Sequence, residues 1–127
     1  MRLSILLKKI VVIMLITQSQ LSFGYLAADG LARSITNKIK PHLPLKSGIT
    51  TLVDVNYSGG VLVYEHTLDV DFPPENKSMV VDWLRGQAHK SACSVSDLRS
   101  FIQNGGSLHY RFFYNSYLLT SIKVERC

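Results

Sequence analysis

His109 and Arg111, near the C-terminus, are two residues whose types and spacing could do chemistry. In a strand, side chains two positions apart point to the same face, so this imidazole and this guanidinium would lie together. A histidine can act as a general acid and an arginine can hold a phosphate, with Glu65 or Asp69 as an acidic partner across a sheet. This pattern fits a small secreted hydrolase or nuclease that uses His109. The simpler interpretation, which we favour, is an ordinary exposed sheet face.

Other patterns that could carry chemistry lack the spacing that the chemistry needs. The sequences "YSGG" and "QNGG" are not followed by the Gly-Lys-Ser/Thr ending of a phosphate-binding loop, so we interpret both as turns. The chain has four histidines without metal-ligand spacing among them, namely His42, His66, His89 and His109. We therefore expect a protein without enzyme activity, metal or cofactor.

The C-terminal part of the chain is rich in aromatic residues, and Phe113 falls on the same strand face as His109 and Arg111. The alternate positions, Tyr110 and Phe112, would cover a core. Aromatic and arginine side chains are favoured anchors of protein–protein interfaces. We therefore predict that His109, Arg111 and Phe113 form a protein-binding face. The alternative is that long loops or the N-terminal helix cover this face.

The N-terminal residues have the three parts of a secretory signal peptide. Positive charges at Arg2, Lys8 and Lys9 precede an unbroken apolar run over residues 10–16, and small residues follow. We predict a signal peptide over residues 1–24 with cleavage before Tyr25. The alternative is an uncleaved inner-membrane anchor through residues 10–28. In both cases the rest of the chain faces an exported compartment, so the protein is periplasmic or secreted.

The positive charge of the chain belongs largely to its first residues. The full sequence has 14 basic and 9 acidic residues, a net charge of +5, and loss of the three basic residues in 1–24 reduces this to +2. No Lys/Arg cluster remains in residues 25–127. We therefore expect no nucleic-acid partner, and a membrane contact only if the N-terminal segment is uncleaved.

The two cysteines, Cys93 and Cys127, predict one disulfide bond in an oxidising compartment. Such a bond would fasten the last residue of the chain, which would otherwise fray. Closing a loop of this length restricts the unfolded chain by roughly 3–4 kcal/mol in the entropy model. A redox-active or metal-binding pair is disfavoured because there is no C-x-x-C spacing.

The hydrophobic pattern predicts a single small domain over residues 25–127. Apolar residues recur at helical spacing in residues 25–40 and 79–92, and a short helix follows Cys93. Alternating runs predict two β-hairpins that turn at Ser58-Gly59-Gly60 and at Asn115-Ser116. We expect a two-layer α+β fold in the order α-ββ-αα-ββ, in which the two hairpins form an antiparallel sheet with the helices on one side.

Three finer expectations accompany this fold. Trp83 is expected on the apolar side of its helix, and Ser94 and Asp97 have the spacing of a capping box for the short helix. Beyond the second turn, alternate residues are expected to share one face of the last strand, namely Leu118, Thr120, Ile122 and Val124.

A recurring pattern is carried by "LPLKSGITTLVDVNYSGGVLVYEHTL", Cys93, "LRSFIQNGGSLHYRFFYN" and "IKVERC". It resembles small exported single-disulfide proteins of Gram-negative bacteria, a group with no settled function, over most of residues 43–127. The resemblance implies export and a disulfide and assigns no catalytic residue.

Together these features favour an exported, periplasmic, non-enzymatic protein-binding module whose partner is another exported protein. Roles of this class include an immunity or inhibitor protein and an accessory factor of a secretion, pilus or conjugation system. The alternative remains the small hydrolase or nuclease that uses His109.

Overall fold

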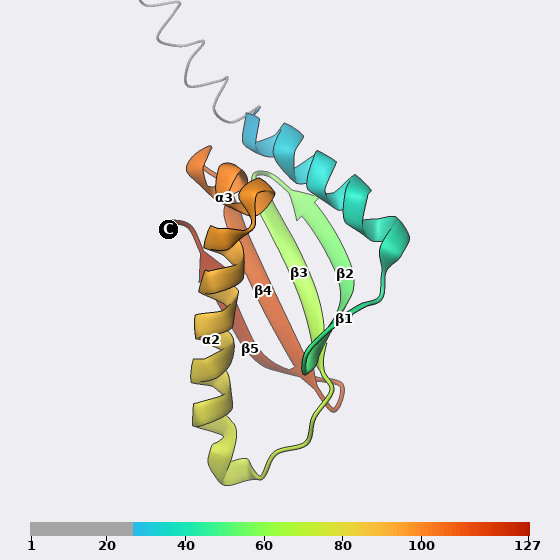
Figure 1. Ribbon diagram of the computed structural model, residues 1–127, viewed down its shortest axis with the longest axis vertical. Helices are drawn as coiled ribbons and strands as arrows, with labels where there is room; N and C mark the ends of the chain where they lie inside the picture. Colours follow the sequence, from blue (N-terminus) through green and yellow to red (C-terminus); the bar gives the residue numbers. More distant parts are fainter. Residues whose placement is uncertain (1–26) are drawn as a thin grey trace, which may run out of the picture.

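The computed structural model describes residues 27–127, which form helices packed against a sheet (Figure 1). The signal peptide expected over residues 1–24, and most of the alternative anchor at 10–28, lie outside this part of the chain. No helix within residues 27–127 is long and apolar enough to cross a membrane. Residues 27–39 are helical, and the elements after them are η1 (Lys40–His42), β1 (Leu45–Ser47), β2 (Thr50–Ser58), β3 (Val61–Leu68), η2 (Pro74–Asn76), α2 (Lys77–Ser94), α3 (Ser96–Gln103), β4 (Ser107–Tyr114) and β5 (Tyr117–Val124).

The five strands form one sheet in the order β1-β2-β3-β4-β5. Both predicted hairpins, β2–β3 and β4–β5, are present and antiparallel, so the α+β fold and its element order are confirmed. The hairpins join through a parallel pair, β3–β4, and the short strand β1 extends the sheet at the β2 edge. The parallel pair was not expected. It forms because α2 and α3 carry the chain back along the sheet, as a parallel crossover requires.

Both hairpin turns use backbone angles in the left-handed region. Gly59 and Gly60 have φ of 55° and 79°, and Asn115 and Ser116 have φ of 47° and 67°. Turns of two residues with positive φ match the twist of the flanking strands. The predicted turn positions are therefore confirmed, and the second turn forms without a glycine.

The core lies between the helices and one face of the sheet (Figure 1). Alternate residues of β3 and β4 point to this inner face, as predicted for Tyr110 and Phe112, and residues from the helix at 27–39, from α2 and from α3 pack on them. The apolar residues buried on the helical side are Ala28, Ala32, Ile35, Leu84, Ala88, Ala92, Leu98, Phe101 and Ile102. The ring of Phe101 packs directly over Gly106, where any Cβ would overlap it.

The predicted face of the last strand was wrong in part. The β4–β5 register shifts between Phe112 and Phe113, which is a β-bulge. A bulge adds one residue to a strand and so changes which side chains face the core. As a result Leu119 is buried and Leu118 is 45% exposed, whereas Ile122 and Val124 face the core as expected.

The predicted capping box was also wrong. Ser94 is the last residue of α2, and its hydroxyl donates a hydrogen bond to the Lys90 carbonyl at 2.6 Å. The short helix α3 begins at Ser96 after Val95, which supplies no side-chain cap. The hydroxyl therefore ends one helix instead of starting the next.

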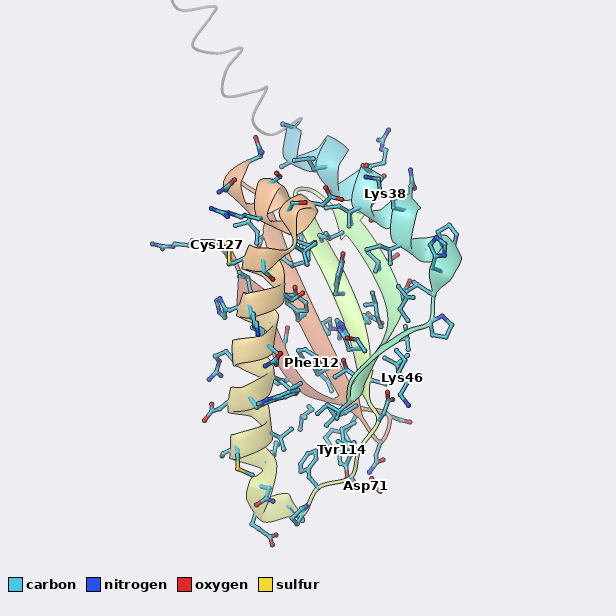
Figure 2. All side chains as sticks on the ribbon, in the orientation of Figure 1. Lys38, Lys46, Asp71, Phe112, Tyr114 and Cys127 are labelled. Carbon is cyan, nitrogen blue, oxygen red and sulfur yellow. A yellow bond between two sulfur atoms is a disulfide. The ribbon has the colours of Figure 1, made fainter. Side chains whose placement is uncertain are left out.

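The disulfide is confirmed between Cys93 and Cys127, whose Cα atoms are 5.5 Å apart. Cys93 lies in the last turn of α2, and Cys127 follows β5 at the end of the chain (Figure 2). The bond closes a loop with a sequence separation of 34 residues. It therefore ties the end of the edge strand to the helix that packs beside it.

Candidate functional site

The outer face of the sheet is the side away from the helices. Its side chains on the two central strands are half-buried, and none is buried: Val61, Val63, Glu65, Thr67, Ser107, His109, Arg111 and Phe113. Within residues 27–127, the helices pack on the opposite, inner face. The described helices and loops therefore leave open the face on which His109, Arg111 and Phe113 lie.

Arg111 is the centre of the outer face. Its Nη1 lies 3.0 Å from Oε1 of Glu65, and the side chains of the pair are 40% and 28% exposed. Its Cζ lies 5.2 Å from the centroid of the Phe113 ring. The guanidinium is thus held by an ion pair on one side and a cation–π contact on the other. This fixes an arginine and an aromatic ring side by side at the surface.

Glu65, one of the two acidic partners proposed for His109, pairs with Arg111 instead. In the β3–β4 register Glu65 stands opposite Arg111, and His109 stands opposite Val63. The hydrogen bond of the His109 ring joins its Nε2 to the Ser107 hydroxyl at 3.0 Å. Partial burial, and then the charge of Lys123, lower the pKa of His109, against a smaller opposing contribution from Glu125. The predicted residues are therefore brought together as a surface, with Glu65 committed to Arg111.

Asp69, the other acidic residue proposed for His109, is also engaged elsewhere. Its two carboxylate oxygens accept hydrogen bonds from Thr51 at 2.5 Å and from Thr67 at 3.4 Å. Among residues 27–127, no group of three or more His, Cys, Asp or Glu side chains could hold a metal ion.

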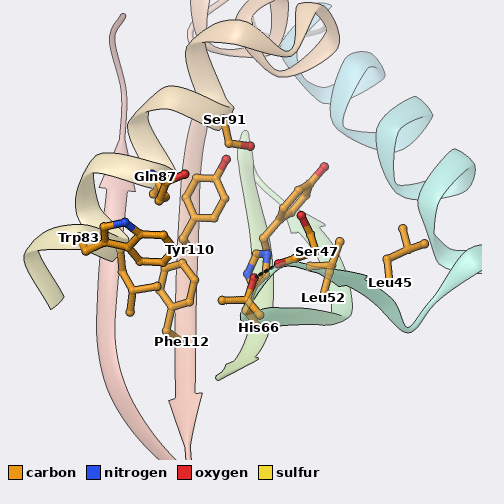
Figure 3. A pocket seen from close by; sticks show the side chains of 13 residues that line it. Leu45, Ser47, Leu52, His66, Trp83, Gln87, Ser91, Tyr110 and Phe112 are labelled. Atoms are coloured by element: carbon orange, nitrogen blue, oxygen red, sulfur yellow. Dashed lines mark hydrogen bonds between the residues drawn. The ribbon is translucent and has the colours of Figure 1, made fainter. Parts of the chain in front are cut away.

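The inner side of the sheet contains a pocket that sequence reasoning missed. Its volume is about 320 Å³, and it lies between the sheet and α2, with β1 at its border (Figure 3). The lining residues carry no formal charge at neutral pH: Leu45, Ser47, Thr50, Leu52, Tyr64, His66, Trp83, Leu84, Gln87, Ala88, Ser91, Tyr110 and Phe112. Its size lies in the range of small-molecule sites.

Aromatic rings from β3 and β4 form the floor of the pocket. His66 stacks on Phe112 with ring centroids 5.0 Å apart, and Tyr64 meets Tyr110 edge to face at 5.7 Å. On the opposite wall, Trp83 projects from α2 and is 47% exposed, although the pattern placed it on the apolar side of the helix. Trp83 lines the pocket instead of filling the core, so its ring lies at the border between pocket and solvent.

Two buried polar atoms of the lining residues have no hydrogen-bond partner within the described residues: the Tyr110 hydroxyl and Nδ1 of His66. Tyr110 is only 3% exposed. Its hydroxyl points toward Ser91 of α2 (Figure 3), which lies near enough to influence it without the geometry of a hydrogen bond. Leaving a buried polar group unpaired costs about 1–3 kcal/mol.

Burial also controls the protonation of these groups. It raises the pKa of Tyr110 to about 12, against a smaller lowering by Ser91. It lowers the pKa of His66 to about 4, against a smaller opposing contribution from the backbone of Tyr64. Both side chains are therefore neutral at neutral pH, and the pocket offers hydrogen-bonding groups without charge.

Comparison with known proteins shows the fold. No family model and no curated protein matches the sequence. Among solved structures, the type II secretion system pilotin EpsS of Vibrio vulnificus has a TM-score of 0.69 at 11% identity, with 81% of this chain and 92% of that chain covered. The pilotin AspS of Vibrio cholerae has a TM-score of 0.65 at 18% identity, with 82% and 94% covered.

A third structure, described as a secreted protein of Pseudomonas aeruginosa, has a TM-score of 0.63 at 13% identity and covers 80% of this chain and 92% of that chain. All three are proteins of Gram-negative bacteria, as the sequence resemblance implied. At these identities the likeness establishes a shared architecture and leaves the roles of individual residues to be derived from this chain.

Proposed function

We propose that this protein is an exported, non-enzymatic binding module that serves as an accessory factor of a secretion system. The shared fold with two type II secretion system pilotins and with a secreted protein supports this class. The disulfide between Cys93 and Cys127 suits an oxidising compartment, the periplasm or the cell exterior. Residues 1–24 would direct the chain there as a cleaved signal peptide.

The observation that carries a binding role is the open outer face with Arg111 at its centre. Arg111 lies between Glu65 and Phe113, so both anchors are already held in place before a partner arrives. Ordered arginine and aromatic side chains lose little freedom on binding and are frequent interface hot spots. We propose that His109, Arg111 and Phe113 contact another exported protein through this face.

Site-directed photo-crosslinking in the native host tests this proposal. A photoreactive phenylalanine analogue placed at Phe113 should crosslink to one exported protein. The matched control places the same analogue at Arg99, an exposed position on α3, on the helical side. Crosslinking at 113 that disappears with Arg111→Ala supports the proposed face. Equal crosslinking at both positions, or none at 113, would refute it.

Export can be tested independently of binding. Mass spectrometry of the protein isolated from its host should give a chain that begins at Tyr25 and gains two daltons on reduction of the disulfide. An intact N-terminus that stays with the membrane after carbonate washing would instead support the anchor through residues 10–28. Loss of RNA or cell-wall hydrolysis in His109→Ala would favour the enzyme alternative.

A further inference from the structure

The pocket and the proposed protein-binding face lie on opposite sides of the sheet. The pocket residues Tyr64, His66, Tyr110 and Phe112 point to the inner face, whereas His109 and the other outer-face residues alternate with them along the strands. A ligand in the pocket would therefore leave the outer face free.

The chemistry of the pocket selects an uncharged ligand. None of its lining side chains is acidic or basic, apart from His66, which burial keeps neutral. A charged group that entered would lose its hydration without gaining an opposite charge, and this is strongly unfavourable. Neutral apolar surface, in contrast, gains from leaving water.

The rings of the pocket favour an aromatic ligand. The rings of His66, Tyr110 and Phe112 lie next to one another and form one aromatic wall. His66 stacks on Phe112, and the rings of Tyr110 and Phe112 are nearly parallel, with an interplanar angle of 8°. Trp83 faces them from α2. Aromatic pairs prefer offset-stacked or edge-to-face contacts, and a flat ring between Trp83 and this aromatic wall can make both kinds.

The two unpartnered polar atoms indicate a hydrogen-bonding group on the ligand. The Tyr110 hydroxyl can donate or accept, and Nδ1 of His66 does one or the other according to its tautomer. Both atoms belong to residues that line the pocket but have almost no accessible surface. A bound group must therefore be small and must displace a neighbouring side chain, such as Ser91 beside Tyr110, to reach them. A hydroxyl or amine on an aromatic ring has this size and can pair with either atom.

We propose that the pocket binds a small, uncharged aromatic molecule that carries a hydroxyl or amine group. The ring lies between Trp83 and the aromatic residues of β3 and β4, and its polar group pairs with the Tyr110 hydroxyl. This is a second binding activity, independent of the proposed protein partner.

The test uses N-phenyl-1-naphthylamine, a neutral aromatic amine that fluoresces in apolar surroundings, with the purified disulfide-bonded protein. Trp83 is the only tryptophan of the chain, so energy transfer from it reports binding at this site. We expect saturable binding. Unlabelled 4-methylphenol should displace the probe at a concentration at least tenfold lower than the charged 4-methylbenzoate, which has a similar shape.

Two substitutions locate the interaction. Tyr110→Phe removes only the unpaired hydroxyl and should weaken 4-methylphenol binding about three- to tenfold, the value of one hydrogen bond. The matched control is Tyr57→Phe, a half-buried tyrosine outside the pocket whose hydroxyl accepts a hydrogen bond from Arg33. It should leave binding unchanged. Ser91→Leu, which places bulk in the pocket, should abolish energy transfer from Trp83.

Several results would overturn the proposal. These are an absence of saturable binding, equal displacement by the neutral and charged competitors, or unchanged binding in Tyr110→Phe. A further contrary result is a fluorescence of Trp83 that changes only when the partner protein captured at position 113 is added. That result would show that the pocket binds a segment of the partner and not a small molecule. Because the probe experiment needs no partner, failure of the proposed secretion role would leave its outcome unaffected.

Discussion

The two sides of the sheet differ in how their polar groups are paired. On the outer face Arg111 bonds to Glu65 and His109 bonds to Ser107, and these side chains remain partly exposed to water. On the inner side the Tyr110 hydroxyl and Nδ1 of His66 are buried and have no partner within residues 27–127. The polar side chains of the outer face find hydrogen-bond partners among neighbouring residues, whereas these two buried atoms of the inner side do not.

The exposed fraction of a side chain alone therefore does not locate a binding site. An outer-face side chain that loses a partner can turn to water at little cost, so the ion pair there stabilises by about 0–1 kcal/mol. A buried hydroxyl cannot turn to water, and so it keeps a capacity for interaction. The outer face therefore offers shape and rigid anchors, whereas the pocket offers unmet hydrogen bonds.

Removal of the disulfide is expected to have the largest effect on stability, and it should affect the inner side of the sheet more than the outer face. Replacing both Cys93 and Cys127 by serine should lower the free energy of unfolding by roughly 3–4 kcal/mol, because the unfolded chain is no longer constrained. The bond holds the end of β5 to α2, and α2 forms one wall of the pocket. Urea denaturation monitored by circular dichroism measures the loss.

Probe binding then shows which side depends on the disulfide. In the double serine variant, N-phenyl-1-naphthylamine binding should weaken under conditions where Phe113 crosslinking persists. Reduction of the wild-type protein should reproduce this result, and reductant should not affect the variant. Parallel loss of both activities would show that the two sides are not independent.

The next effect is the pH dependence that His66 imposes. Its pKa is about 4 in the folded protein and near 6.5 when unfolded, so between these values the unfolded chain binds a proton that the folded one does not. Stability is therefore full above about pH 6.5 and falls as the pH drops to about 4, and His66 contributes about 3 kcal/mol to this loss. Denaturation at a series of pH values measures it.

His109 on the outer face is the control for the pH dependence predicted for His66. Its pKa is also lowered, in the same direction, but it is much less buried than His66. His66→Gln should therefore flatten the pH profile between about 6.5 and 4 much more than His109→Gln does. If the two substitutions flattened the profile equally, the contrast in burial between the two faces would be wrong.

Much of this fold could be predicted from local patterns. Alternation with a period of two placed Tyr110 and Phe112 on one face and His109, Arg111 and Phe113 on the other, and the structure has this division. The disulfide followed from cysteine number and compartment. These features depend on residues close in sequence or on a simple count, so one sequence is enough to find them.

The features that were missed depend on residues far apart in sequence. The parallel β3–β4 pair is set by the path of α2 and α3, and the bulge at Phe112 and Phe113 is set by pairing with β5. The pocket forms only where β1, β2, β3, β4 and α2 come together. His66 alternates with Leu62 and Tyr64 in the sequence, but nothing in that alternation shows that Trp83 lies across the pocket from it.

The smallest expected effects compare one deletion from each side. Arg111→Ala should lower the free energy of unfolding by about 1 kcal/mol or less, because Glu65 can be solvated once its partner is removed. Tyr110→Phe should leave stability unchanged or raise it by about 1 kcal/mol, because it removes an unpaired buried hydroxyl and keeps the ring. Chemical denaturation at neutral pH compares both variants with the wild type. A clear loss of stability in Tyr110→Phe would mean that the hydroxyl pairs with Ser91 in solution, and the contrast between a saturated and an unsaturated side would then disappear.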